Sequence, residues 1–232
     1  MTRVALCLLA ALIVGCAATS VAPAVTAEAL RQQAVARRSE GKSAEAENLL
    51  GQAIRAQPTQ TRDQRSAAAD LRRELASLRV AGDDLVGAEK LYREALTLLE
   101  TAPRGADAAI INLRTQLAGL CYRQSRFDEA ADFYRTVLAL EVTLLGETHP
   151  DPLGTMSILG GLELKRTKFA EAETLFRRQL RGVQQVHGAE KRETASVLDN
   201  LADVLEKAGR AAEATRLRGE AARIRRKLCD EC

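Results

Sequence analysis

Small and apolar residues recur along this chain at a constant interval of 42 positions. The related segments read SAEAENLL, VGAEKLYREAL, FDEAADFYRTVL, FAEAETLFRRQL and AAEATRLRGEA. Their central alanines are Ala46, Ala88, Ala130, Ala172 and Ala214. An apolar residue follows each alanine after three positions, and in all but one segment a small or apolar residue follows after seven. Since residues at i, i+3 and i+7 share one face of a helix, each segment is predicted to be an amphipathic helix.

A second helical pattern precedes each of these segments. Twelve positions before the alanines stand further small residues: Ala34, Ala76, Ala118, Gly160 and Ala202. Between the two patterns lies a short turn that contains Gly41, Gly82, Ser125, Thr167 and Gly209. Gly41 and Gly209 suit the left-handed conformation that ends many helices. Each unit is therefore predicted to be a helix, a turn, a second helix and a connector.

Five such units account for about residues 27–228. Their expected bounds are about 27–60, 61–103, 104–146, 147–188 and 189–228. A single helix pair cannot bury its apolar face alone, so neighbouring pairs must stack. Aromatic residues make up only 3% of the chain and tryptophan is absent, which favours closely packed helices over a β-sandwich. The fold class is therefore predicted to be all-α.

The segment LLGETHPDPLGTM, residues 144–156, has the polar residues of a catalytic loop but the spacing of a connector. Gly146 suits the end of a helix and has a counterpart one repeat later, at Gly188. Pro150 suits the first turn of the next helix, where a missing N–H is harmless. His149 is then a residue of the turn. Its periodic counterpart is a lysine, so the two histidines of the chain do not form a symmetric ligand pair.

These features resemble one known family. The small residue, the turn, the EA dipeptide and the apolar positions after it are similar to the tetratricopeptide repeat, and the 42-residue period is similar to its kinesin-light-chain type. Residues 138–162 resemble the linker of that type, and residues 199–214 resemble its first helix and turn. The resemblance implies a right-handed α-solenoid of about five repeats, capped by a last helix at Ala211–Leu228. It also implies a groove, lined by the first helix of each repeat, that holds a protein or peptide.

The contacts of that family, carried onto the matching positions, give a candidate partner-binding groove. Its residues are Arg31, Arg73, Asn112, Gln116, Tyr122, Asn200 and Asp203. An asparagine such as Asn200 can both donate to and accept from a peptide backbone, so it binds without choosing a sequence. Gly119 and Gly161 would open floor space beside it. The alternative for each residue is ordinary solvated helix surface.

The N-terminal residues have the layout of a secretory signal peptide. Val4–Val14 is apolar but too short to span a bilayer, which needs ~20 residues. The stretch IVGC resembles the lipobox of bacterial lipoproteins, which implies cleavage before Cys16 and lipid attachment to its sulfur. Residues 1–15 are then the signal peptide and 16–26 a lipidated tether, although an ordinary signal peptidase is the alternative. Ala17 stands where an aspartate often marks inner-membrane retention, which favours the outer membrane, facing the periplasm.

Charge gives no reason to expect nucleic acid as a partner, because 34 basic and 31 acidic residues leave a net charge of +3. Basic residues do gather near the C-terminus: Arg216, Arg218, Arg223, Arg225, Arg226 and Lys227. They are interpreted as a solvated face of the last helix, as such runs usually are. Contact with anionic lipid or an acidic partner is the alternative.

Motifs of enzyme chemistry are missing: the chain has no glycine-rich phosphate loop, no HExxH and no GxSxG. Cys121 falls inside a predicted helix and is expected to be a buried free thiol. Cys229 and Cys232 form a CxxC in a predicted tail, 229–232, after a helix whose dipole disfavours a thiolate. No catalytic residue, metal site or cofactor is therefore predicted, and a disulfide in the tail stays open.

The combined prediction is a lipid-anchored, non-catalytic scaffold of the bacterial cell envelope that binds a protein or peptide partner. Three alternatives stay open. They are an accessory lipoprotein for envelope assembly or secretion, a solenoid that self-associates, and a thiol-redox factor that uses the terminal cysteines.

Overall fold

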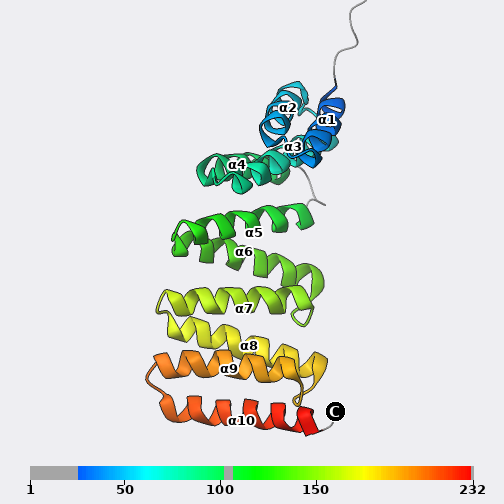
Figure 1. The fold of residues 1–232 in the computed structure, drawn as a ribbon. Helices are drawn as coiled ribbons and strands as arrows, with labels where there is room; N and C mark the ends of the chain where they lie inside the picture. The colour runs from blue at the N-terminus through cyan, green and yellow to red at the C-terminus, as the bar shows by residue number, and fades with distance from the viewer. Residues whose placement is uncertain (1–25, 102–106, 231–232) are drawn as a thin grey trace, which may run out of the picture.

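The computed structural model describes residues 26–101 and 107–230, and within these ranges all regular structure is helical. The helices of these ranges are α1 (Ala27–Ser39), α2 (Ser43–Ala56), α3 (Arg62–Ala81), α4 (Leu85–Glu100), α5 (Asp107–Arg123), α6 (Phe127–Leu145), α7 (Pro150–Lys165), α8 (Phe169–His187), α9 (Arg192–Lys207) and α10 (Ala211–Asp230). Figure 1 shows them stacked along one axis, from α1 and α2 at one end to α10 at the other. The predicted all-α class is confirmed.

Consecutive helices pair as the repeat pattern predicts. Each odd-numbered helix packs on the even-numbered helix that follows it, and each pair contacts the next one, as α6 contacts α7 and α8 contacts α9. The described residues therefore form a right-handed α-solenoid of helix pairs, in which each pair is buried mainly by its neighbours in the stack (Figure 1).

Small residues lie at the buried positions that the 42-residue period marks. The five central alanines, from Ala46 to Ala214, are each at most 1% exposed. The small residues upstream of them are buried as well, and Ala118 and Ala130, which form one such pair, share a single apolar cluster. Short side chains let the two helices of a repeat approach closely, which explains why large apolar residues do not occupy these positions.

The turn inside each repeat places one residue in the left-handed conformation. These residues are Gly41, Asp83, Ser125, Thr167 and Gly209, with φ between 61° and 80°. The next residue donates its N–H back to the helix end, as Arg126 N does to Cys121 O at 2.8 Å, and so satisfies a carbonyl that the helix leaves unpaired. Gly82, expected in this turn, ends α3 with φ −85°; the left-handed residue of the second repeat is Asp83, which keeps the 42-residue register.

The segment 144–156 is a connector, as predicted. Helix α6 ends at Gly146, which has φ 86°, and Pro150 is the first residue of α7. Between them, Nδ1 of His149 accepts a hydrogen bond from the N–H of Asp151 at 3.3 Å. His149 therefore caps the start of a helix.

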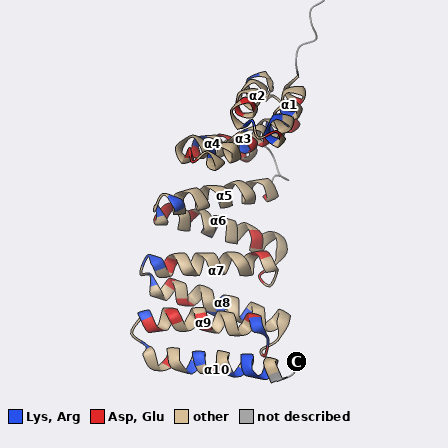
Figure 2. Cartoon of the chain, viewed as in Figure 1, with Lys and Arg blue, Asp and Glu red and all other residues tan. Residues whose placement is uncertain are grey.

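Basic residues of α10 pair with acidic residues of α9, the first helix of the same repeat. Arg218 contacts Asp203 at 2.7 Å and Glu206 at 2.5 Å, and Arg225 pairs with Asp199. Figure 2 shows these charges along α9 and α10. The run is solvated, as predicted, but it also fastens the last helix to its neighbour.

Helix α10 runs to Asp230, so Cys229 is an exposed residue of a helix that extends beyond the predicted end at Leu228. Cys121 is a buried free thiol, as predicted. Cys16, the signal peptide and Cys232 lie outside the described residues. Among the helices that the structure describes, none is long and apolar enough to cross a membrane.

Two adjacent glycines of α7 test how closely the helices approach. A Cβ atom at Gly160 would lie 2.8 Å from the Phe176 ring, whereas one at Gly161 would meet nothing within 4 Å. We expect Gly160→Ala to be about 1–3 kcal/mol less stable than its matched control Gly161→Ala, because only the first variant overpacks the core. Urea unfolding measures both free energies, and equal values would contradict the close approach.

Candidate functional site

Equivalent positions on three odd-numbered helices carry exposed or partly exposed side chains. Gln116 of α5, Ile158 of α7 and Asn200 of α9 are each separated by one 42-residue period. Gln116 is exposed, Asn200 is partly exposed and Ile158 is 50% exposed. Together with Asn112, one turn before Gln116, they form what we call the odd-helix surface, in which amides lie on both sides of one apolar side chain.

The amides of the odd-helix surface are available to a partner. The side chains of Asn112, Gln116 and Asn200 make no hydrogen bond to any residue that the structure describes. Each amide offers one acceptor oxygen and two N–H donors. Beside them, a Cβ atom at Gly119 or Gly161 would meet nothing within 4 Å, so the helix backbone is open to close approach there.

The charged residues of the predicted groove are held in ion pairs. Arg31 Nε donates to Glu74 at 2.9 Å, and this contact raises the pKa of the Arg31 guanidinium. Arg73 is paired within α3 at 3.2 Å. Asp203 accepts from Arg218 of α10 at 2.7 Å. A partner would have to share or displace these contacts, so the uncharged amides are the more accessible groups.

Tyr122, the remaining predicted residue, is 46% exposed and joins a small aromatic cluster. Its ring meets the Phe127 ring edge-on at 5.5 Å, and the Lys165 ammonium lies 5.2 Å from the centre of the Tyr122 ring. These contacts link α5, α6 and α7. Tyr122 therefore helps to hold successive repeats together, besides presenting part of its ring to solvent.

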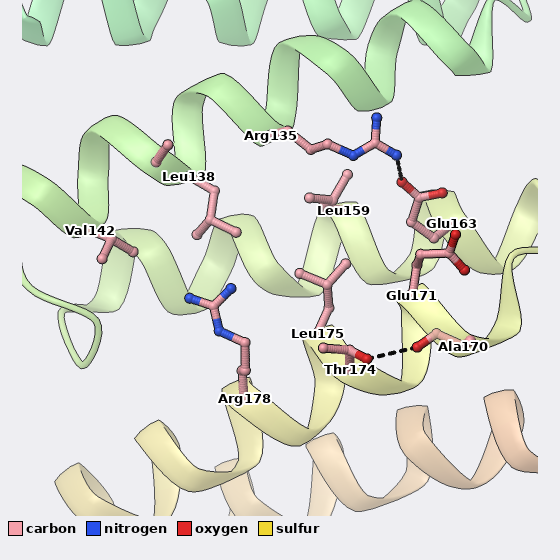
Figure 3. A pocket seen from close by; sticks show the side chains of 11 residues that line it. Arg135, Leu138, Val142, Leu159, Glu163, Ala170, Glu171, Thr174, Leu175 and Arg178 are labelled. Atoms are coloured by element: carbon pink, nitrogen blue, oxygen red, sulfur yellow. Dashed lines mark hydrogen bonds and ion pairs between the residues drawn. The ribbon is translucent and has the colours of Figure 1, made fainter.

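A separate hollow lies between α6 and α8, with residues of α7 at its floor, and encloses about 580 Å³ (Figure 3). We call it the α6–α8 cleft. Its apolar walls are Leu138 and Val142 of α6, Leu159 of α7 and Leu175 of α8. None of the seven predicted groove residues lines it. The predicted residues lie on α1, α3, α5 and α9, whereas the cleft is lined by α6, α7 and α8.

A buried carboxylate lies at one end of the α6–α8 cleft. Glu163 is 1% exposed and accepts hydrogen bonds from Arg135 and, at 2.7 Å, from Arg166. Arg166 also pairs with Asp128 of α6 at 2.5 Å. These contacts join α6 to α7. Because two guanidinium groups compensate the charge of Glu163, this carboxylate is not a free base for proton transfer.

One cluster has the atoms of a metal site but not its electrostatics. Glu89, Cys121 and Glu129 place their ligand atoms within 4.8 Å of one another. Arg126 already supplies the cation, at 2.5 Å from each glutamate, and it lowers the pKa of both carboxyls. Burial raises the pKa of the Cys121 thiol, which favours the protonated form that binds metals poorly. A similar Glu–Arg–Glu arrangement recurs around Arg210 without a cysteine, so this is an ion-pair network.

Comparison with known families matches residues 151–227 and residues 111–151 to the tetratricopeptide repeat. No curated protein matches the chain. Because these two segments adjoin, the match runs through α6 to α9 without a break.

Solved structures with similar folds include kinesin-light-chain-like proteins. A putative kinesin light chain from Podosopora anserina, with nearly identical TPR-like repeats, has a TM-score of 0.68 and 19% identity, over 87% of this chain and 95% of that one. BtubC (BKLC) from P. vanneervenii has a TM-score of 0.62 and 22% identity, over 87% of this chain and 80% of that one. YrrB, a TPR protein with an unusual peptide-binding site, has a TM-score of 0.57 and 14% identity, over 85% and 86%. These likenesses concern the fold.

Two features of the surface were not predicted: Ile158 and the α6–α8 cleft. The period itself points to Ile158, which stands one repeat after Gln116 and one before Asn200. The cleft depends on which side chains are too short to fill the space between neighbouring helices, and the helical pattern alone does not show this.

Glu141 of α6 is a second buried carboxylate, 7% exposed, and its Oε2 atom has no hydrogen-bond partner among the described residues. Burial raises the pKa of this carboxyl, although a hydrogen bond with the Thr155 side chain opposes the shift. Asp151 also raises it and His149 lowers it. The folded state therefore holds the Glu141 proton more tightly than the unfolded state does.

We expect Glu141→Gln to raise the melting temperature relative to the wild type as the pH rises above the ordinary carboxyl pKa of 4.5, and to flatten its dependence on pH. The contribution of Glu141 to stability is full below the ordinary carboxyl pKa of 4.5 and is lost as pH rises through the raised folded value. Thermal unfolding between about pH 4 and pH 8 measures the effect, with the exposed Glu220→Gln as control. An unchanged profile in Glu141→Gln would contradict burial of an ionisable group here.

Proposed function

Because the chain belongs to the tetratricopeptide repeat family, we propose that it is a scaffold that binds a protein or peptide partner on the odd-helix surface. One observation carries the proposal: Asn112, Gln116 and Asn200 present amides that no other described residue satisfies. Gln116 and Asn200 occupy the same position of their repeats, two periods of 42 residues apart, and Asn112 lies one helical turn before Gln116.

An extended peptide suits this arrangement. Its backbone can exchange hydrogen bonds with Gln116 and Asn200 while one of its apolar side chains covers Ile158 between them. Amide hydrogen bonds give affinity without selecting a sequence, and apolar burial adds roughly 25 cal/mol per Å². The peptide-binding site of YrrB, a neighbour in fold, supports this kind of partner.

The proposed role needs no reaction at the protein. The carboxylates near Cys121 and at Glu163 accept hydrogen bonds from arginines, so neither cluster offers a free general base. This supports a binding function over turnover.

We further propose that a lipid on Cys16 holds the solenoid at a bacterial envelope membrane, on the periplasmic side of the outer membrane. The stretch IVGC at the end of an apolar segment supports this part. Each methylene buried in a bilayer contributes ~0.8 kcal/mol, so two or three acyl chains would hold the scaffold stably. A partner bound on the odd-helix surface would then be kept near the membrane.

We expect the triple variant Asn112→Ala, Gln116→Ala and Asn200→Ala to bind its partner at least ten-fold more weakly, since each lost hydrogen bond costs about 0.5–1.5 kcal/mol. In-cell crosslinking and mass spectrometry identify the partner, and titration with the purified proteins measures the affinity. Far-UV circular dichroism should be unchanged.

The matched control for this variant is Asn48→Ala with Gln52→Ala, which removes exposed amides from the even-numbered helix α2. It should leave the affinity unchanged. Equal binding by the triple variant and the wild type would remove the odd-helix surface as the binding site.

We expect Cys16→Ser to abolish incorporation of labelled palmitate and to release the protein from the membrane fraction. Cys121→Ser and Cys229→Ser are the controls, and both should stay labelled and membrane-bound. Equal labelling of the wild type and Cys16→Ser would reject the anchor without touching the proposed binding function.

A further inference from the structure

The α6–α8 cleft is one member of a series that the repeat generates. Shifting its lining by 42 residues gives a smaller cleft between α4 and α6, of about 290 Å³ against about 580 Å³. Leu96 corresponds there to Leu138, and Glu129 to Glu171. We call it the α4–α6 cleft. The two clefts occupy equivalent places in the repeat and are lined by different side chains.

Two differences explain the extra space in the α6–α8 cleft. Phe133 lines the α4–α6 cleft, and its counterpart one repeat later is the shorter Leu175. Glu100 pairs with Arg114 at 2.8 Å beside the smaller cleft, whereas the counterpart of Glu100 is the apolar Val142. The larger cleft is therefore wider, and it has an apolar side chain where the smaller cleft has an ion-paired glutamate.

The smaller cleft also shows which group fits this place. The Arg93 guanidinium lies 5.5 Å from the centre of the Phe133 ring, a cation–π contact worth about 0.5–1 kcal/mol at an exposed site. Its counterpart Arg135 extends over the larger cleft near Leu159, and it contacts no aromatic ring among the described residues (Figure 3). An aromatic side chain from a partner would thus meet the same cation and similar apolar walls.

The charges at the rim favour a basic residue beside that ring. Glu129 in the smaller cleft has Arg126 at 2.5 Å, whereas among the described residues its counterpart Glu171 pairs with Lys168 alone, at 3.9 Å. The Glu171 side chain is 54% exposed, and its carboxylate stands at the rim of the cleft (Figure 3). Glu171 and Leu175 are one helical turn apart, which is about 5–6 Å between Cβ atoms.

We propose that the α6–α8 cleft is a second docking site, for a peptide segment of a partner protein that carries an aromatic side chain and, about one helical turn away, a lysine or arginine. The ring enters beside Leu175 and Leu159, below Arg135, and the basic group pairs with Glu171. The cleft shares no residue with the odd-helix surface, so this proposal stands apart from the proposed function.

Random dodecapeptides displayed on phage, selected against the immobilised full chain, test the proposal. The enriched peptides should share an aromatic residue with a lysine or arginine about three or four positions away. Leu175→Phe copies the neighbouring repeat and fills the cleft. It should bind an enriched peptide at least ten-fold more weakly in fluorescence anisotropy, while its melting temperature stays close to that of the wild type.

The matched control is Phe133→Leu, which changes the equivalent residue of the α4–α6 cleft and should retain full affinity. Glu171→Lys should also weaken binding, and a peptide with glutamate in place of its basic residue should bind Glu171→Lys better than it binds the wild type. This exchange separates the expected ion pair from a general loss of stability.

Enriched peptides without an aromatic residue, or equal affinity for the wild type and Leu175→Phe, would overturn the proposal. Loss of peptide binding in the Asn112, Gln116 and Asn200 triple variant but not in Leu175→Phe would assign the peptides to the odd-helix surface instead. A third outcome is that no peptide is enriched, while oleate binds the wild type and not Leu175→Phe. The cleft would then be a small-molecule pocket, and the peptide site would be rejected.

Discussion

The whole structure depends on the close approach of two helices that cannot bury their apolar faces alone. Ala118 and Ala130 show the requirement, since both are fully buried in one cluster and their counterparts are small in the other repeats. Packing, and not any ligand, therefore imposes the 42-residue period. Exposed positions meet no such demand, and they differ from repeat to repeat. Binding surfaces arise where these differences accumulate.

Ion pairs also join consecutive even-numbered helices, but one of these pairs is missing between α6 and α8. Glu89 of α4 pairs with Arg126 at the start of α6, and Glu173 of α8 pairs with Arg210 at the start of α10. At the junction between α6 and α8, the counterpart of both arginines is Lys168, and the counterpart of both glutamates is alanine. The α6–α8 junction therefore lacks the ion pair that both of its neighbours have, and the larger of the two clefts lies there.

The period predicted the helices, the helix pairs and the connector at His149, because each depends on local spacing and on turn chemistry. The resemblance to the tetratricopeptide repeat, and not the period alone, pointed to the amides of Gln116 and Asn200, which are exposed and partly exposed. The ion pairs of Arg31 and Asp203 were not predictable, since each joins residues of two different helices through a long arginine side chain that can reach several partners. The left-handed residue of the second turn was assigned to Gly82, because glycine favours that conformation, whereas the register of the other four turns points to Asp83.

The network at Glu163 joins α6 to α7 beside the junction that lacks this ion pair. Arg135 of α6 reaches Glu163 of α7, and Arg166 connects the same carboxylate to Asp128. A buried carboxylate is stable only while its partners stay in place, because losing one leaves an uncompensated charge. The contact between α6 and α7 therefore depends on a buried network at one end of the cleft. Beyond the network lie the apolar walls of the cleft, from Leu138 to Leu175, where Leu175 and Val142 take the places that Phe133 and Glu100 hold one repeat earlier.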